Sequence, residues 1–189
     1  MKTLSLIIAL LAILSLPAFT QQPKPAIAPP ANPPTTKLEA FQVRSGQVRV
    51  KNYSRLGTVN GIGGTILVQV MEIVDPQSQQ KVQGLLIEVA GSGRYDRPQR
   101  SFIDADEIDS LLKGIEYISK VDGKQTKLTN FEAAYESRGG LKVTAFNAEG
   151  GEIDIGVTAG TDNVYFKLAD FAPMRALIEQ SKVQIAALR

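Results

Sequence analysis

The chain contains no cysteine and no histidine. Without cysteine it can form no disulfide and offers no thiol nucleophile, so an exported fold would be stabilised by its core alone. The absence of histidine removes the usual general base at neutral pH and the commonest metal ligand. Serine–histidine and cysteine–histidine hydrolase mechanisms and ordinary zinc sites are therefore excluded. We assign no catalytic residue, no metal site and no cofactor from the sequence.

The sequence also lacks a large excess of charge of either sign. The sequence has 21 basic and 19 acidic residues, and Lys2 is the only charged residue among the first twenty. A balance this close does not indicate a dedicated nucleic-acid binder, and it gives no strong overall attraction to a membrane surface.

The N-terminus has the layout of a secretory signal peptide. Lys2 supplies a positive charge, Leu4–Leu16 is an apolar run, and the small residues Ala18 and Thr20 precede a cut at Gln21. The apolar run is about 13 residues long, whereas a membrane-spanning helix needs roughly 20. We expect residues 1–20 to be removed, which leaves a secreted or periplasmic protein with no stable membrane span.

Residues 21–37 form a proline-rich linker. Six prolines stand there among mostly small residues, a composition that favours extended polyproline II and cannot build a core. We interpret this segment as a spacer, with a ligand for a proline-recognising domain as the alternative. The folded domain is expected over residues 38–189.

Hydrophobic patterning over that domain predicts strands and two helices. Residues 65–74 are apolar on both faces, which indicates a central strand covered on both sides. Asn60 and Gly61 fit a tight hairpin turn. The expected strands are at residues 41–51, 65–74, 82–90, 99–103, 128–137, 141–147, 152–157 and 163–168.

A helix is expected after each group of four strands. Asp104, with Glu107 three residues on, fits the N-cap of the first helix, and Asp170 fits that of the second. An offset of 66 residues aligns the two apolar stripes, so Leu111 and Leu177 should occupy equivalent core sites.

We therefore expect an α+β fold of two tandem ββββα units, residues 38–121 and 122–189, whose antiparallel sheets each end in a capped helix. This order of elements resembles that of the Whirly and Pur-type folds, which bind single-stranded nucleic acid. The resemblance is topological and covers residues 40–188. It implies a fold and says little about function.

The best candidate ligand site is basic and aromatic. The loop after the third expected strand carries several cations and a tyrosine, and a second group of cations lies near the first expected strand. The two groups could form one surface. Such a surface suits phosphate or carboxylate groups and stacking on rings; the alternative is a solvated loop with scattered cations. The candidate residues are Arg49, Lys51, Tyr53, Arg94, Tyr95, Arg97 and Arg100, with Arg44 and Arg55 nearby.

Two clusters of acidic residues are less specific indicators of a functional site. Residues 104–109 hold four acids, which could bind Ca²⁺ or Mg²⁺ or could sit at a helix N-terminus, where the helix dipole favours them. In the second unit, acidic side chains should share the outer face of the sheet with Phe146 and Tyr165. Those aromatics would mark an interface or be covered by the other unit.

The sequence favours an exported, non-enzymatic binding or interaction protein of unknown ligand, and a protein partner or a homo-oligomer is open. One alternative is a polyanion or single-stranded nucleic-acid binder that uses the basic aromatic face, although the balanced charge makes nucleic acid the less favoured ligand. The other is a hydrolase that uses carboxylates.

We predict that the exported chain begins at or near Gln21. N-terminal sequencing of the exported protein should give Gln-Gln-Pro, because the small residues Ala18 and Thr20 satisfy signal peptidase geometry. Recovery of an intact Met1 in the membrane fraction would contradict the prediction.

Overall fold

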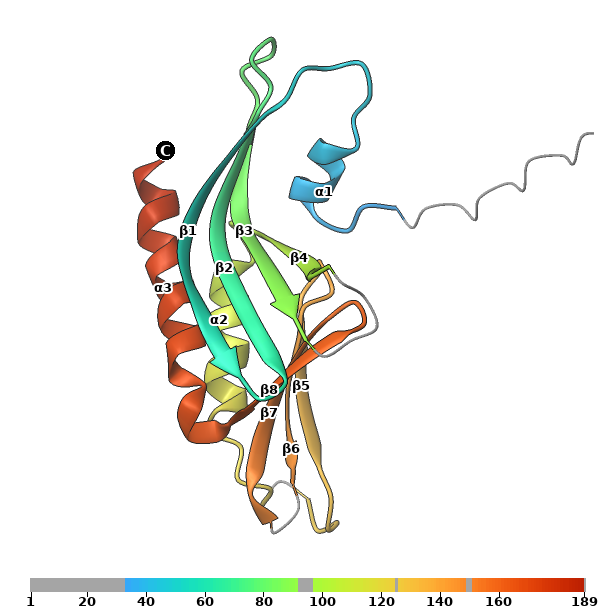
Figure 1. The fold of residues 1–189 in the computed structure, drawn as a ribbon, viewed down its shortest axis with the longest axis vertical. Coiled ribbons are helices and arrows are strands. Elements are labelled where there is room, and N and C mark those ends of the chain that lie inside the picture. The colour runs from blue at the N-terminus through green and yellow to red at the C-terminus, as the bar shows by residue number, and fades with distance from the viewer. Residues whose placement is uncertain (1–32, 92–96, 125, 149–150, 189) are drawn as a thin grey trace, which may run out of the picture. The chain divides into compact units, whose positions relative to one another are not determined.

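The computed structural model describes residues 33–91, 97–124, 126–148 and 151–188. Residues Pro33–Arg189 form one compact unit, and the expected signal peptide and most of the proline-rich linker lie outside the described residues. The fold is α+β (Figure 1). Its elements are α1 (Lys37–Gln42), β1 (Val50–Gly61), β2 (Gly64–Val74), β3 (Lys81–Ala90), β4 (Gln99–Asp104), α2 (Ile108–Ile118), β5 (Glu132–Glu136), β6 (Lys142–Asn147), β7 (Ile153–Ala159), β8 (Asp162–Lys167), the 3₁₀ turn η2 (Leu168–Asp170) and α3 (Ala172–Ala187).

The strands form two antiparallel four-stranded sheets. Sheet A has the order β1-β2-β3-β4 and sheet B the order β5-β6-β7-β8. Within each sheet, strands that are consecutive in the chain pair with one another. Among the described helices, none combines the length and the apolar character that crossing a bilayer requires.

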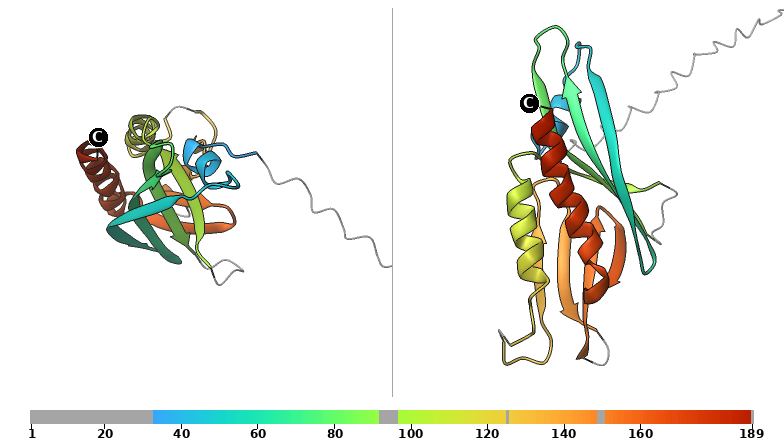
Figure 2. Two further views of the ribbon diagram at one scale, coloured as in Figure 1. Left: turned by 90° about the horizontal axis from the view of Figure 1, so that it is seen from above. Right: turned by 90° about the vertical axis from the view of Figure 1, so that its left-hand side faces the viewer.

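Each long helix packs on the sheet of the other half of the chain. α2 follows sheet A but lies against β5 and β6, and α3 follows sheet B but lies against β1, β2 and β3 (Figure 2). Two glycines permit this close approach. A Cβ on Gly114 of α2 would stand 2.4 Å from the ring of Tyr135, and one on Gly57 of β1 would stand 2.9 Å from Leu177 of α3.

This exchange of helices produces one shared hydrophobic core. Its buried side chains come from both sheets and both long helices, with Ile87, Ile115, Val157 and Ile178 among them. A second, smaller cluster lies on the opposite face of sheet A. There Leu38 and Phe41 of α1 pack on Met71, Ile73 and Leu86. The expectation that β2 is covered on both faces is confirmed.

The β1–β2 hairpin also joins the two sheets directly. The backbones of Ile62 and Tyr165 exchange two hydrogen bonds, of 2.7 and 3.1 Å, at the outer edge of β8. Gly61 makes the approach possible, because a Cβ there would lie 2.5 Å from the side chain of Val164. The turn itself is Ile62-Gly63, with Gly63 at φ +80°, two residues beyond the expected Asn60-Gly61 turn.

The prediction of a strand over residues 41–51 was wrong. Residues 37–42 form α1 instead, and β1 begins at Val50. A complete capping box starts this helix: the Thr36 hydroxyl accepts from the backbone N–H of Glu39, and the Glu39 carboxylate accepts from that of Thr36.

The predicted caps of the two long helices were also wrong. Asp104 is the last residue of β4, and the N-cap residue of α2 is Glu107, whose side chain makes no capping hydrogen bond. Asp170 belongs to η2, and α3 begins after Phe171 without a side-chain cap. Pro173 lies in the first turn of α3 as expected.

The two positions matched by the 66-residue offset differ in burial. Leu111 is fully buried in the shared core, whereas Leu177 is half-buried and packs on its margin against Gly57.

Replacing Leu111 with alanine should lower the free energy of unfolding by about 2–5 kcal/mol, because the leucine side chain is fully buried. Leu177→Ala should cost less. Both sheets should unfold in one transition, because α2 packs on sheet B and α3 on sheet A. Urea unfolding followed by circular dichroism measures both effects. A loss below about 1 kcal/mol for Leu111→Ala, or two separate transitions, would contradict the shared core.

Candidate binding surface

Three of the described candidate residues, Lys51, Tyr53 and Arg100, project from one face of sheet A. Lys51 and Tyr53 are paired with Ile73 and Met71, which belong to the cluster under α1, so both side chains point to the α1 side of the sheet. Arg100 lies on the same side. Ile103 of β4 points into the shared core, and Arg100, three residues earlier in the strand, therefore points the opposite way. Arg94 and Tyr95 lie outside the described residues.

The register separates these residues into two corners of that face. Lys51 lies level with Val82 of β3, whereas Arg100 lies level with Glu88, six residues further along and on the opposite edge strand. Three strand spacings and six residue rises correspond to about 25 Å between them. Arg97 is exposed just before β4, at the corner of Arg100. A small ligand could not contact both corners, whereas a polymer could.

At the β1 corner, Arg49 and Lys51 hold the C-terminal end of α1. The Arg49 guanidinium donates to the backbone carbonyls of Phe41 and Gln42, and Lys51 Nζ donates to the Gln42 amide oxygen at 2.8 Å. A cation at a helix C-terminus satisfies unpaired carbonyls and interacts favourably with the helix dipole. The two side chains are therefore held in fixed positions by neutral acceptors.

The cations at this corner form no ion pair within the described residues, although the pKa of Asp75 is lowered by a hydrogen bond from Ser78 and, to a lesser extent, by the charge of Arg44. No acid occurs in the sequence between Glu39 and Glu72, whereas Arg44, Arg49, Lys51 and Arg55 all lie in that interval. None of these four cations forms an ion pair in the described part of the chain, although nine other basic residues do. Arg100, at the other corner, is paired with Glu88 at 2.7 Å.

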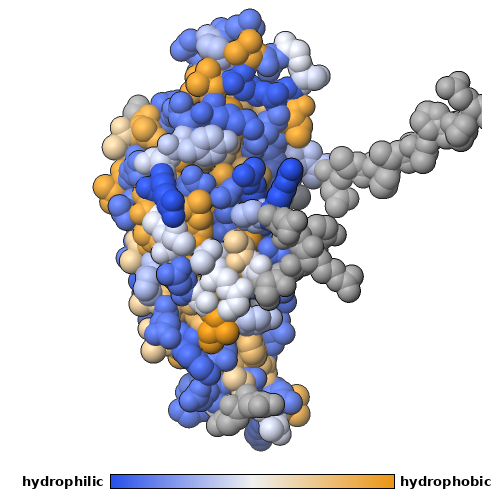
Figure 3. Space-filling model, viewed as in Figure 1, coloured by the Kyte–Doolittle hydropathy of each residue, from blue (hydrophilic) through white to orange (hydrophobic). Residues whose placement is uncertain are grey.

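Tyr53 is placed between two of these cations. Lys51, Tyr53 and Arg55 are alternate residues of β1, so all three project from the α1 side of the edge strand. The tyrosine is 51% exposed. Figure 3 views this side of the molecule, where hydrophilic side chains predominate over the described surface with apolar patches among them.

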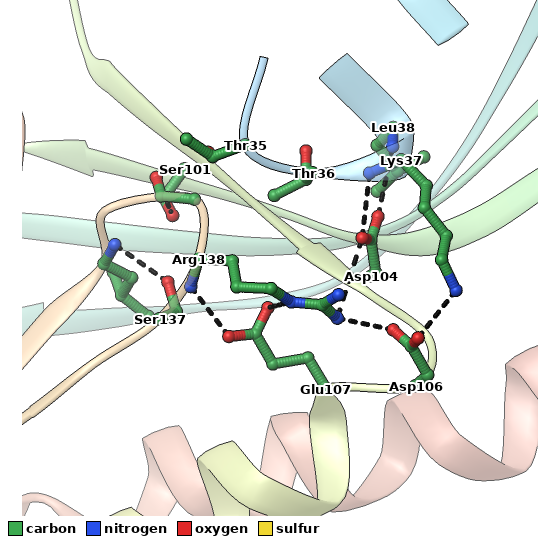
Figure 4. Close-up of polar contacts among 12 residues, drawn as sticks. Thr35, Thr36, Lys37, Leu38, Ser101, Asp104, Asp106, Glu107, Ser137 and Arg138 are labelled. Atoms are coloured by element: carbon green, nitrogen blue, oxygen red, sulfur yellow. Dashed lines mark hydrogen bonds and ion pairs between the residues drawn. The ribbon is translucent and has the colours of Figure 1, made fainter. Parts of the chain in front are cut away.

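At the other end of α1, Asp104 binds the helix N-terminus. Its carboxylate accepts from the backbone N–H groups of Lys37 at 2.8 Å and Leu38 at 3.1 Å (Figure 4). Together with the Thr36–Glu39 capping box, these bonds satisfy the first-turn donors of a six-residue helix. Asp104 thus caps a helix, but it caps α1 rather than α2.

The neighbouring acids bind Arg138, in the turn between β5 and β6. Its guanidinium pairs with Asp106 at 2.5 Å and with Glu107 at 3.2 Å, and its backbone N–H donates to Glu107 at 2.7 Å (Figure 4). Lys37 Nζ also reaches Asp106, at 2.6 Å. Hydrogen bonds from Lys37 and Arg138 hold the pKa of Asp106 below its ordinary value.

These contacts give the carboxylates of Asp106 and Glu107 partners within the protein. Lys37 and Arg138 occupy the positions around these carboxylates that a cation would take, and the described residues contain no cluster of three or more metal-ligating side chains. A cavity of about 260 Å³ adjoins the acidic segment, lined in part by Asp104 and Asp106. The pKa of Asp106 is lowered, whereas a carboxylic acid that donates a proton near neutral pH needs a raised pKa. The cavity therefore gives no support to a carboxylate general acid.

The second exposed surface is the outer face of sheet B. The register places Phe146, Asp154 and Tyr165 on this face, as expected, together with Glu132 and Glu136. The two aromatic rings meet edge to face, with their centroids 6.1 Å apart. They lie over Gly156, and Tyr165 is 41% exposed.

Sequence reasoning missed α1 and Arg138. The Thr36–Glu39 spacing is a capping-box signal that could have located the helix. Arg138 stands in a glycine turn and gives no comparable signal, because its partners lie 31 and 32 residues away in the chain.

Comparison of the chain with protein families, with characterised proteins and with solved structures gave no match.

Replacing Asp104 with alanine should detach α1 while leaving the shared core folded, because the change removes the carboxylate that accepts from two backbone N–H groups of α1, on the far side of sheet A from that core. Hydrogen exchange should show faster exchange of the Lys37 and Leu38 amides and unchanged protection in β6 and β7. The exposed ion-paired Asp122 provides the control, as Asp122→Ala. Unchanged exchange at Lys37 and Leu38 in Asp104→Ala would show that Asp104 does not hold the helix.

Proposed function

We propose that this chain is an exported, non-enzymatic binding protein, and that its ligand is an anionic polymer bound on the α1 side of sheet A. We define the basic face as Arg49, Lys51, Tyr53, Arg55 and Arg100. The observation that supports this proposal is the charge at the β1 corner, where none of the four cations of residues 40–71 forms an ion pair in the described structure. Arg44 alone of the four has an acid, Asp75, within electrostatic reach.

The arrangement of the β1 corner suits a repeating anion. Lys51 and Arg55 lie four residues apart on one side of a strand, which places their Cα atoms roughly 13 Å apart with Tyr53 between them. Phosphate, sulfate or carboxylate groups can bind such cations, and a base or sugar ring can stack on the tyrosine between them. Arg49 pays no further ordering cost on binding, because α1 already fixes its side chain.

The separation of the two corners favours a polymer over a small ligand. A chain that reached from Lys51 to Arg100 would extend over about 25 Å, by the strand and residue spacings. It would pass α1, which covers Met71, Ile73 and Leu86 between the two corners. The exposed Arg97 would add charge where it leaves the sheet.

The expected signal peptide supports an exported location, secreted or periplasmic. The order of four strands and a helix, repeated once, supports a Whirly-like or Pur-like topology, which we propose as the structural relationship of the domain. Folds of this order bind single-stranded nucleic acid, so such a ligand is one form of the proposed polyanion.

A second candidate function is protein–protein interaction through the outer face of sheet B. Tyr165 and Phe146 are the observation that favours it, since partly exposed aromatics surrounded by charged side chains are typical of interface centres. A partner protein or a second copy of the chain would cover this face.

We predict that the chain from Gln21 onward binds single-stranded DNA or a sulfated polysaccharide at low salt and that the affinity falls steeply as salt rises. The double variant Lys51→Ala, Arg55→Ala should weaken binding at least tenfold and reduce the slope of log K against log salt by about 1–2, because two anion contacts are lost. Titration at several salt concentrations measures both quantities.

The matched control is Lys113→Ala, Lys127→Ala. It removes the same charge from two exposed lysines, on α2 and in the loop before β5. An equal loss of polyanion affinity in the control would show that binding depends on the net charge of the protein rather than on the basic face. No binding of either polymer by the unaltered protein at low salt would refute the polyanion proposal and favour the outer face of sheet B.

A further inference from the structure

The loop between α1 and β1, together with the first residue of β1, exposes three valine side chains within eight residues. Val43 is 68% exposed, Val48 is 60% exposed and Val50 is 46% exposed. All three belong to an eight-residue segment, residues 43–50, which we call the tip. At the turn of the tip, Gly46 adopts φ +75°, and a Cβ there would meet no atom within 4 Å.

Cations alternate with these valines. Arg44 follows Val43, and Arg49 stands between Val48 and Val50. The Arg44 guanidinium lies 4.4 Å from the centroid of the Phe41 ring and donates to Gln80 at 3.0 Å, while Arg49 binds the carbonyls at the end of α1. The tip is therefore attached at both arginines to the folded domain, and its apolar side chains are held at the surface.

The tip lies at one end of the described molecule. The loop before β1 and the turn between β2 and β3 reach the same end in Figure 1, and the upper end in Figure 3 mixes apolar and hydrophilic side chains. No described element packs over the valines, which are exposed. A burial site for them must come from outside the described chain.

We propose that the tip docks on the surface of an anionic lipid bilayer. Valine side chains would enter the boundary between headgroups and acyl chains, and Arg44, Arg49 and Lys51 would meet the anionic headgroups. Charge complementarity supports this occupant, because none of these three cations forms an ion pair in the described structure, and only Arg44 has an acid, Asp75, within electrostatic reach. The proposal deepens the proposed binding function, on which it rests for the shared charge at the β1 corner.

The valines distinguish a bilayer from a soluble polymer. Phosphate or sulfate groups on a polymer gain nothing from three exposed aliphatic side chains, whereas an interface that is charged outside and apolar inside accommodates both kinds of residue. The basic face and the tip therefore make separable predictions, one for Lys51 and Arg55 and one for the valines.

The experiment measures sedimentation of the chain from Gln21 onward with vesicles of neutral phosphatidylcholine, alone or with a third of anionic phosphatidylglycerol. This chain retains the compact unit Pro33–Arg189 and omits the apolar run Leu4–Leu16, which would bind vesicles by itself. We expect at least tenfold stronger binding to the anionic vesicles, since each cation at such a surface contributes about fivefold.

The triple variant Val43→Ser, Val48→Ser, Val50→Ser should lose at least tenfold in vesicle binding and keep its affinity for the soluble polyanion. Its thermal midpoint should be unchanged, because all three side chains are exposed. The matched control changes three equally exposed apolar residues elsewhere, Tyr117, Leu128 and Val183, to serine. This control should bind vesicles like the unaltered protein.

Failure of this inference is distinguishable from failure of the proposed function. Absence of vesicle binding, or an equal loss in both triple variants, would refute docking by the tip; polyanion binding that depended on Lys51 and Arg55 would leave the proposed function standing. Vesicle binding that depended on the valines, without polyanion binding, would support the tip and refute the polymer ligand.

Discussion

The structure depends on the packing of each long helix against the sheet formed by the other half of the chain. This arrangement needs two close contacts, Gly114 against Tyr135 and Gly57 against Leu177, where any Cβ would collide with a side chain. With the helices exchanged, the face of each sheet that lines the shared core is covered only when both halves are present. One core then serves the whole domain, which suits a chain that has no cysteine and must be stabilised by burial alone.

The exchange also explains the polar junction at the end of β4. When α2 crosses to sheet B, the short segment that leads into it passes the turn between β5 and β6, and Arg138 binds Asp106 and Glu107 there. Two residues before Asp106, Asp104 faces the other side of sheet A and caps α1. Four consecutive residues, 104–107, thus connect both halves of the chain and the N-terminal helix, and each of the three acids among them has a partner in these contacts.

Patterns local in sequence were sufficient for the class and for most strands. Residues 65–74, apolar on both faces, were correctly expected to form a central strand, and the alternation in residues 152–157 correctly separated the outer acids from the core. The helix exchange could not be predicted, because an apolar stripe such as Ile108, Leu111 and Ile115 shows that a face is buried without showing which sheet buries it. Asp104 shows the same limit, since a carboxylate before a helix has the sequence of a local cap, yet its partners are 66 and 67 residues away. Of the candidate site, the residue types and the shared face of sheet A could be anticipated. The division into two corners follows only from strand register.

The hydrogen bonds between Ile62 and Tyr165 have a consequence for the behaviour of this protein at high concentration. Two open sheets present four strand edges, and each unpaired edge is a template on which another chain could add a strand. The Ile62 bridge occupies part of the β8 edge, and the bulge between Arg55 and Gly57 interrupts the β1 edge. β4 is only six residues long, and β5 begins and ends with glutamate. Each of the four edges thus carries a different feature of the kind that disfavours the addition of a strand from another copy of the chain.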